Sequence, residues 1–129
     1  MTGIRGRTPS GAWGVTLDAP DPQELAEFYA GLLGWRVGSV DPTWVTVEPP
    51  HEGVSLGFHL NEAFRPPVWP SQADEQQQML HLDIEVDDLE AAVADAVVAG
   101  ARLAEFQPQD DVRVLLDPVG HPFCLYLGP

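Results

Sequence analysis

Residues 14–34 read GVTLDAPDPQELAEFYAGLLG, and this stretch decides the fold. Apolar residues alternate with polar or small ones over residues 14–19, which is the pattern of a strand with one buried face. A helix is predicted next, because Asp21 is a favourable N-cap and Pro22 suits the first helical position. Gly34 is a natural helix stop. The apolar residues of this helix recur at helical spacing: Leu25, Phe28, Tyr29, Leu32 and Leu33.

The same pattern recurs 67 positions later, so that Gly14 aligns with His81. Residues 81–86 alternate again, and Asp87 can cap the helix that follows. Gly100 can end this second helix. Its predicted apolar stripe consists of Leu89, Ala92, Val93, Ala96 and Val97. A duplicated unit is therefore the organising feature of the chain.

Each predicted helix is followed by three strand-like runs. These runs are residues 35–40, 43–48 and 54–60 in the first half, and residues 101–107, 112–117 and 122–127 in the second. The sequence therefore predicts an α+β fold of two βαβββ modules. Its predicted parts are a flexible N-terminal tail (1–11), a first module (12–60), a proline-rich linker (61–79) and a second module (80–129).

The charge of the chain excludes several partners. Six arginines, no lysine and 20 acidic residues give a net charge of −14. This balance argues against binding to nucleic acid or to an anionic membrane surface. The absence of lysine excludes catalysis through a lysine Schiff base. The apolar fraction of 44% is ordinary for a globular domain, so the chain can bury a core.

Cysteine content and the N-terminus indicate a compartment. Cys124 is the only cysteine, so an intrachain disulfide is impossible. Residues 1–11 carry two arginines but no apolar run, which is unlike a signal peptide. No stretch approaches the length of a membrane span. We therefore expect a cytoplasmic protein.

Three motifs resemble one superfamily. Residues 21–35 look like the first helix of the vicinal oxygen chelate superfamily, which includes glyoxalase-like proteins, bleomycin-resistance proteins and extradiol dioxygenases. Residues 81–88, HLDIEVDD, resemble the strand that opens the second module of that superfamily. Residues 117–125, DPVGHPFCL, resemble its final turn and strand. The resemblance implies curved mixed sheets that form a cup for a small molecule.

The resemblance also implies where a metal would bind. In metal-using members four ligands come from the first and last strands of each module, and these positions correspond here to Gly14, Gly57, His81 and Cys124. Two of the four have no side chain, and Cys124 replaces the usual carboxylate. We therefore expect no metal cofactor, with a divalent metal as the alternative. Gly14 and Gly57 are expected to leave space in the cup for an organic ligand.

Candidate catalytic residues lie on one strand. His81 shares a face with Asp83 and Glu85, because alternate residues of a strand point the same way. A carboxylate can orient His81 for acid–base catalysis. The alternatives are a pocket-lining role, or a histidine that is only hydrogen-bonded on a half-exposed face. A metal site formed by His59, His81 and one of these carboxylates is also conceivable.

Further residues are candidates for ligand binding. They are Gly14, Trp44, Gly57, His59, Trp69, Cys124 and Tyr126. The tryptophans can stack on a planar ligand or belong to the core. Cys124 can instead be a small buried apolar residue. His51 and His121 are expected to be exposed in turns. The linker, through Phe64 and Trp69, is expected either to pack on the edge of the core or to cover the pocket as a lid.

The resemblance and the residues together lead to one functional expectation. We expect a metal-free glyoxalase-like protein that binds a small aromatic or amphipathic molecule, in the manner implied by bleomycin-resistance proteins. The alternative is a lyase, isomerase or hydrolase of a small metabolite that uses His81 with Asp83 or Glu85. A ligand-free interaction module is the third possibility. Superfamily members often pair, so we expect a homodimer.

Overall fold

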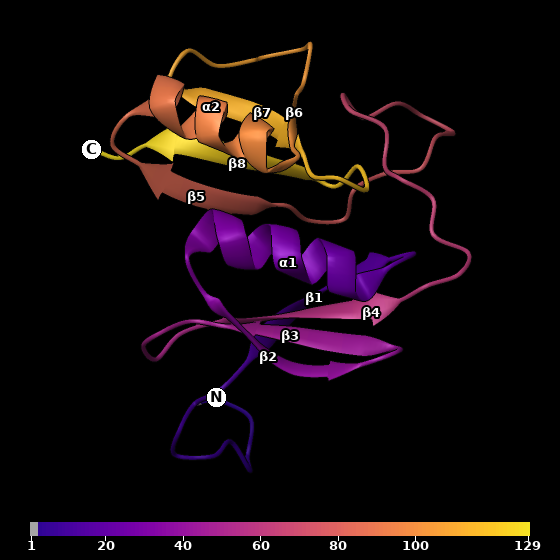
Figure 1. Ribbon diagram of the computed structural model, residues 1–129, viewed down its shortest axis with the longest axis vertical. Coiled ribbons are helices and arrows are strands. Elements are labelled where there is room, and N and C mark those ends of the chain that lie inside the picture. Colours follow the sequence, from indigo (N-terminus) through magenta and orange to yellow (C-terminus); the bar gives the residue numbers. More distant parts are fainter. Residues whose placement is uncertain (1–2) are drawn as a thin grey trace.

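The computed structural model describes residues 3–129 and contains two helices and two sheets (Figure 1). The first half comprises β1 (Gly14–Ala19), α1 (Pro22–Leu33), β2 (Arg36–Asp41), β3 (Trp44–Glu48) and β4 (Ser55–Leu60). The second comprises β5 (Leu82–Val86), α2 (Leu89–Ala99), β6 (Arg102–Leu103), β7 (Val112–Leu116) and β8 (Pro122–Leu127). Residues 1–2 of the predicted tail lie outside the described residues.

The two sheets repeat one topology. Their strand orders are β1-β4-β3-β2 and β5-β8-β7-β6. The pairs β1–β4 and β5–β8 are parallel, and the remaining neighbours are antiparallel. The predicted pair of βαβββ modules is therefore confirmed. In each module the first strand lies at one edge of its sheet, so β1 and β5 occupy equivalent edges.

The caps explain where the helices begin. The Asp21 carboxylate accepts a hydrogen bond from the Glu24 amide at 3.2 Å, as the sequence predicted. The second helix is capped by Asp88, whose carboxylate accepts from the Ala91 amide at 3.0 Å. The prediction of Asp87 as this cap was wrong, because the helix begins at Leu89 and the residue before it takes the cap position.

One apolar core joins the modules, and α1 lies at its centre. The ring of Tyr29 stacks on Phe58 of β4 with centroids 5.7 Å apart, and its edge meets Phe123 of β8 at 6.0 Å. All three side chains are fully buried. Figure 1 shows α1 between the two sheets. Both sheets therefore turn one side towards α1. We call the opposite side of each sheet its open face.

Two expectations for the second module need correction. Only Ala96 of the predicted α2 stripe is buried, and Val97 is 45% exposed. Helix α2 contacts one sheet and α1, whereas α1 contacts the first sheet and also meets Phe123 of the second. The strand predicted over residues 101–107 is limited to Arg102–Leu103. The side-chain amide of Gln107 takes the place of a longer strand, since it donates to the Val114 carbonyl and accepts from the Val114 amide, both at 2.9 Å.

The linker packs on the second module. The Phe64 ring lies 5.1 Å from the ring of His121, centroid to centroid. Trp69 lies 6.2 Å from Phe106, centroid to centroid, and donates its indole N–H to the Phe106 carbonyl at 3.1 Å.

Within residues 3–129 no helix has the length and apolar character needed to cross a membrane.

Candidate functional site

The open face of the first sheet carries polar and aromatic side chains. Thr16 and Asp18 come from β1, opposite in direction to the buried Leu17. Strands β3 and β4 are in register, so that Trp44 pairs with His59 and Thr46 pairs with Gly57. These side chains share one face because alternate residues of a strand point the same way. The face therefore brings together Thr16, Asp18, Trp44, Thr46, Gly57 and His59.

The indole of Trp44 occupies the space that a side chain at residue 57 would fill. A Cβ atom at residue 57 would collide with Cη2 of Trp44 and would lie 2.7 Å from its Cζ2. Glycine at 57 is therefore what allows the indole to lie across this part of the sheet. We expected Gly57 to leave empty space, and the structure corrects this, because the indole lies there instead. Trp44 remains partly exposed and offers a flat apolar surface.

Beside this indole lies a small polar cluster. The Asp18 carboxylate accepts a hydrogen bond from the Asn61 side-chain amide at 3.1 Å. Its other oxygen lies 3.7 Å from Nδ1 of His59, and both side chains are about half exposed. The His59 ring is tilted against Trp44, with centroids 6.4 Å apart. The first open face thus combines an aromatic surface with a carboxylate and an imidazole.

The open face of the second sheet gathers the predicted catalytic residues. His81 Nε2 lies 3.1 Å from Oδ1 of Asp83, and both side chains are substantially exposed. The register between β5 and β8 pairs Asp83 with Cys124. Ligand-type atoms of His81, Asp83 and Cys124 all lie within 4.8 Å of one another. Glu85 is not part of this group, because its carboxylate lies against Gly128. Tyr126 pairs with Glu85 and is half-buried.

Burial raises the pKa of the Cys124 thiol to about 11, and the charge of Asp83 and a hydrogen bond to it act in the same direction. The thiol therefore keeps its proton at neutral pH. A protonated thiol is a poor nucleophile.

The metal site of the family does not fit these residues. Gly14 and Gly57 supply no donor atoms, and Trp44 covers the second of these positions. A Cβ at Gly14 would lie 3.0 Å from the Ser55 carbonyl oxygen, so the backbones are close there as well. The three donors that do converge, His81, Asp83 and Cys124, come from the second module alone. We therefore derive no chemistry through a metal.

Sequence reasoning missed two residues near the first open face. Asp18 lies on the same face of its strand as the predicted position Gly14, four residues earlier, so the strand period was a signal for it. His121 was expected to be exposed in a turn. It is half-buried instead, because its Nε2 contacts the backbone oxygen of Asp18 at 2.7 Å, 103 residues away. No local pattern signals such a contact.

The predicted ligand residue Trp69 lies elsewhere. Its ring packs on Phe106, and its indole N–H donates to the Phe106 carbonyl. These contacts are with the second module and do not involve Trp44 or His81. The linker nevertheless forms one wall of a cavity beside β1, which is lined by Phe64 but not by Trp69.

Comparisons with known proteins agree with the fold. Residues 14–126 match the family described as Glyoxalase-like domain. A glyoxalase/bleomycin resistance protein/dioxygenase family enzyme from Burkholderia phytofirmans PsJN has a TM-score of 0.68 at 18% identity, with 90% of this chain and 96% of that chain covered. A glyoxalase/bleomycin resistance protein from Albidiferax ferrireducens T118 scores 0.62 at 19% identity, covering 92% and 98%.

A fosfomycin resistance protein from Mesorhizobium loti also shares the fold, with a TM-score of 0.62 at 13% identity and coverage of 98% and 94%. No curated protein matches the chain. The family match spans both modules, including the strands that form the two open faces. The chain therefore belongs to the glyoxalase-like domain family.

Proposed function

We propose that the protein binds small planar, aromatic or amphipathic molecules without a metal, and that Trp44 is the surface on which they stack. The observation that carries this proposal is the indole of Trp44 lying across Gly57, at a position where metal-using relatives would place a ligand. An exposed indole face binds planar molecules through dispersion and offset stacking.

The charge around Trp44 sets the preferred ligand. Asp18 and His59 border the indole, and the chain carries a net charge of −14. Neutral or cationic compounds are therefore favoured over anions. Structural neighbours named for resistance to bleomycin and fosfomycin support the view that this fold accommodates drug-like molecules.

We further propose that a second copy of the chain covers these faces. Three large apolar side chains stand exposed immediately before the edge strands β1 and β5: Trp13 is 59% exposed, Met79 is 91% exposed and Leu80 is 60% exposed. Such side chains flanking unpaired strand edges are typical of protein contacts. The molar mass in solution tests this, since Trp13→Asp should convert a dimer into a monomer. A wild-type monomer at high concentration would refute it.

Fluorescence titration tests the ligand proposal. Proflavine is a planar cation, and benzoate is a small aromatic anion. We expect proflavine to bind and Trp44→Leu to weaken it about tenfold, which corresponds to the loss of one stacking partner. Trp69→Leu is the matched control, because it removes an indole that packs on Phe106. Equal affinity of wild type and Trp44→Leu, or a requirement for added metal, would refute the proposal.

An enzymatic function is the second candidate, and the pairing of His81 with Asp83 favours it. The Asp83 carboxylate lies 3.1 Å from His81 Nε2, so it can accept a hydrogen bond from Nε2–H and leave Nδ1 as the base. Such a pair suits a lyase, isomerase or hydrolase of a small metabolite. Any turnover found should disappear in His81→Ala, while Asp83→Asn should lower kcat and shift the pH profile. Activity that survives His81→Ala would exclude this role.

A further inference from the structure

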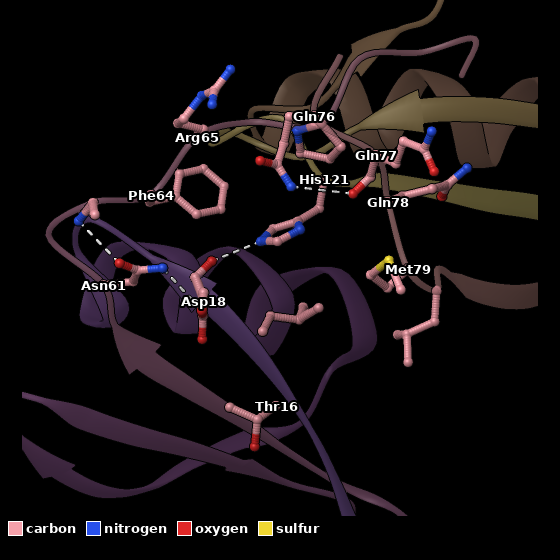
Figure 2. A pocket seen from close by; sticks show the side chains of 14 residues that line it. Thr16, Asp18, Asn61, Phe64, Arg65, Gln76, Gln77, Gln78, Met79 and His121 are labelled. Atoms are coloured by element: carbon pink, nitrogen blue, oxygen red, sulfur yellow. Dashed lines mark hydrogen bonds between the residues drawn. The ribbon is translucent and has the colours of Figure 1, made fainter. Parts of the chain in front are cut away.

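A cavity of about 360 Å³ lies between β1 and the linker, at the end of β1 away from Gly14. Its volume is within the range of sites for small organic ligands. Figure 2 shows the ring of His121 in the middle of this cavity wall, with Phe64 on one side and Met79 on the other. Leu17 and Leu80 also line it.

The contact between His121 and β1 determines the tautomer of the imidazole. Nε2 of His121 lies 2.7 Å from the backbone oxygen of Asp18. A carbonyl oxygen only accepts hydrogen bonds, so Nε2 must carry the proton. In the neutral ring Nδ1 is then an acceptor with a free lone pair. Nδ1 makes no hydrogen bond within the part of the chain that the structure describes.

The surroundings of this acceptor combine apolar side chains with the polar groups of Asp18, Asn61 and the run of glutamines 76–78. The Phe64 ring lies 5.1 Å from the His121 ring and is tilted by 57° to it, and a third ring can pack beside this pair. Leu17, Met79 and Leu80 supply aliphatic and thioether surface. The cavity thus offers the positioned acceptor of His121 beside a surface for an aromatic ring, and the buried Oε1 of Gln78 is a second acceptor in its lining.

The charges disfavour an anion. Asp18, which lines the cavity, is a carboxylate, and the chain as a whole is strongly acidic. Arg65 is the single cation among the lining residues, and it is exposed to solvent. A ring compound whose only polar group is a carboxylate, such as benzoate, would also lack a proton for His121 Nδ1.

We propose that this cavity is a binding site for small neutral hydroxylated aromatic compounds, whose hydroxyl donates to Nδ1 of His121 and whose ring packs on Phe64. This cavity is a different site from the one proposed at Trp44, because neither Trp44 nor His81 lines it; the two sites share only Asp18 as a neighbour. Phenol is the simplest probe of this chemistry. Anisole has a similar shape without the donor, and benzoate carries a negative charge instead.

Long-range ¹H–¹⁵N spectra of the histidine rings at pH 8 test the proposal directly. We expect His121 to show the Nε2–H tautomer in the free protein. Titration with phenol should move its Nδ1 resonance saturably, and anisole should bind about tenfold more weakly, since one hydrogen bond is lost. A His121 with the proton on Nδ1, equal binding of phenol and anisole, or tighter binding of benzoate would overturn the proposal.

Two variants add specificity. His121→Phe keeps a ring but removes the acceptor, and it should abolish the preference for phenol over anisole. His51→Phe is the matched control, since His51 contacts only the neighbouring Glu52 carbonyl among the described residues. If His121→Phe does not fold, Ala63→Phe fills the cavity from an exposed position and should block phenol. Phenol binding that persists in Ala63→Phe, or that is lost in Trp44→Leu, would place the ligand elsewhere.

Discussion

The hydroxyl of Tyr29 donates a 2.8 Å hydrogen bond to Oδ2 of Asp117, across 88 residues of sequence. Tyr29 belongs to α1 in the first module, and Asp117 follows β7 in the second. Both side chains are buried. The second oxygen of Asp117 accepts from the backbone amides of Val119, Gly120 and His121, each at 3.0 Å. This carboxylate therefore links the two modules and holds the turn that presents His121.

Tyr29→Phe should destabilise the protein by about 1–3 kcal/mol, because it leaves one oxygen of a buried carboxylate without its donor. Urea unfolding of wild type and variant at neutral pH measures the change. Tyr126→Phe is the control, since the Tyr126 hydroxyl makes no hydrogen bond among residues 3–129. An equal decrease in the free energy of unfolding in the two variants would mean that the hydrogen bond between Tyr29 and Asp117 contributes nothing to stability.

Asp117 should also give the stability a pH dependence. Burial raises the pKa of Asp117 and outweighs the lowering by His121 and by the hydrogen bonds. Between about pH 3.9, the ordinary value for aspartate, and the raised pKa, the folded protein binds more protons than the unfolded chain. The contribution of Asp117 to the free energy of unfolding is therefore fully present at pH values below the ordinary pKa of aspartate. It is lost as the pH rises through the raised pKa of the folded protein.

Unfolding of wild type and Asp117→Asn between pH 4 and pH 7 measures this effect. The stability of the wild type relative to the variant should fall as the pH rises. Asp95→Asn, at an exposed position of α2, should leave the pH dependence of the wild type unchanged. A relative stability that rises with pH would contradict the assignment.

Gly57→Ala should cost about 1–3 kcal/mol, because the new methyl group collides with the indole of Trp44. In a Trp44→Ala background the same substitution should cost less, because only Thr16 Oγ1, at 3.1 Å, remains close to the new methyl group, and the double-mutant cycle isolates the contact with the indole. Gly31→Ala in α1 is the control, with no atom near the added methyl group, and it should stabilise by about 0.5–1 kcal/mol. Additive effects at residues 44 and 57 would show that the indole does not lie across the glycine.

Asp83→Asn should lower the pKa of Cys124 from about 11, because it removes a neighbouring negative charge. The rate of alkylation by iodoacetamide at pH 9 should then rise about threefold to tenfold, in proportion to the thiolate fraction. Glu85→Gln should have little effect, since Glu85 lies against Gly128 rather than beside the thiol. An unchanged alkylation rate in Asp83→Asn would show that Asp83 does not raise the pKa of Cys124.

The sequence alone was sufficient for most of the fold. Strand alternation and the caps at Asp21 and Gly34 are local properties, and they predicted the elements of the first module to within a residue or two. The buried face of the second helix was less well predicted. Its apolar residues are distributed around much of the helix, so tertiary packing decides which of them are buried. The end of β6 was missed because a side chain, Gln107, replaces backbone pairing.

The candidate site divides in the same way. The shared face of His81 and Asp83 followed from the period of a strand, and the structure brings the two side chains to 3.1 Å. Their catalytic role stays a prediction. The sequence also identified the family. That Gly14 and Gly57 stand at ligand positions of metal-using members stays a prediction from the resemblance.

Only the tertiary structure decided what fills the space at Gly57 and what surrounds His121. The indole of Trp44 reaches Gly57 from a neighbouring strand, and His121 reaches Asp18 from the other module. Such contacts depend on how strands are registered and how modules pack, which bring together residues distant in the chain. Local periodicity specifies which face a side chain occupies, but the partner that it meets there is set by the packing of the whole core.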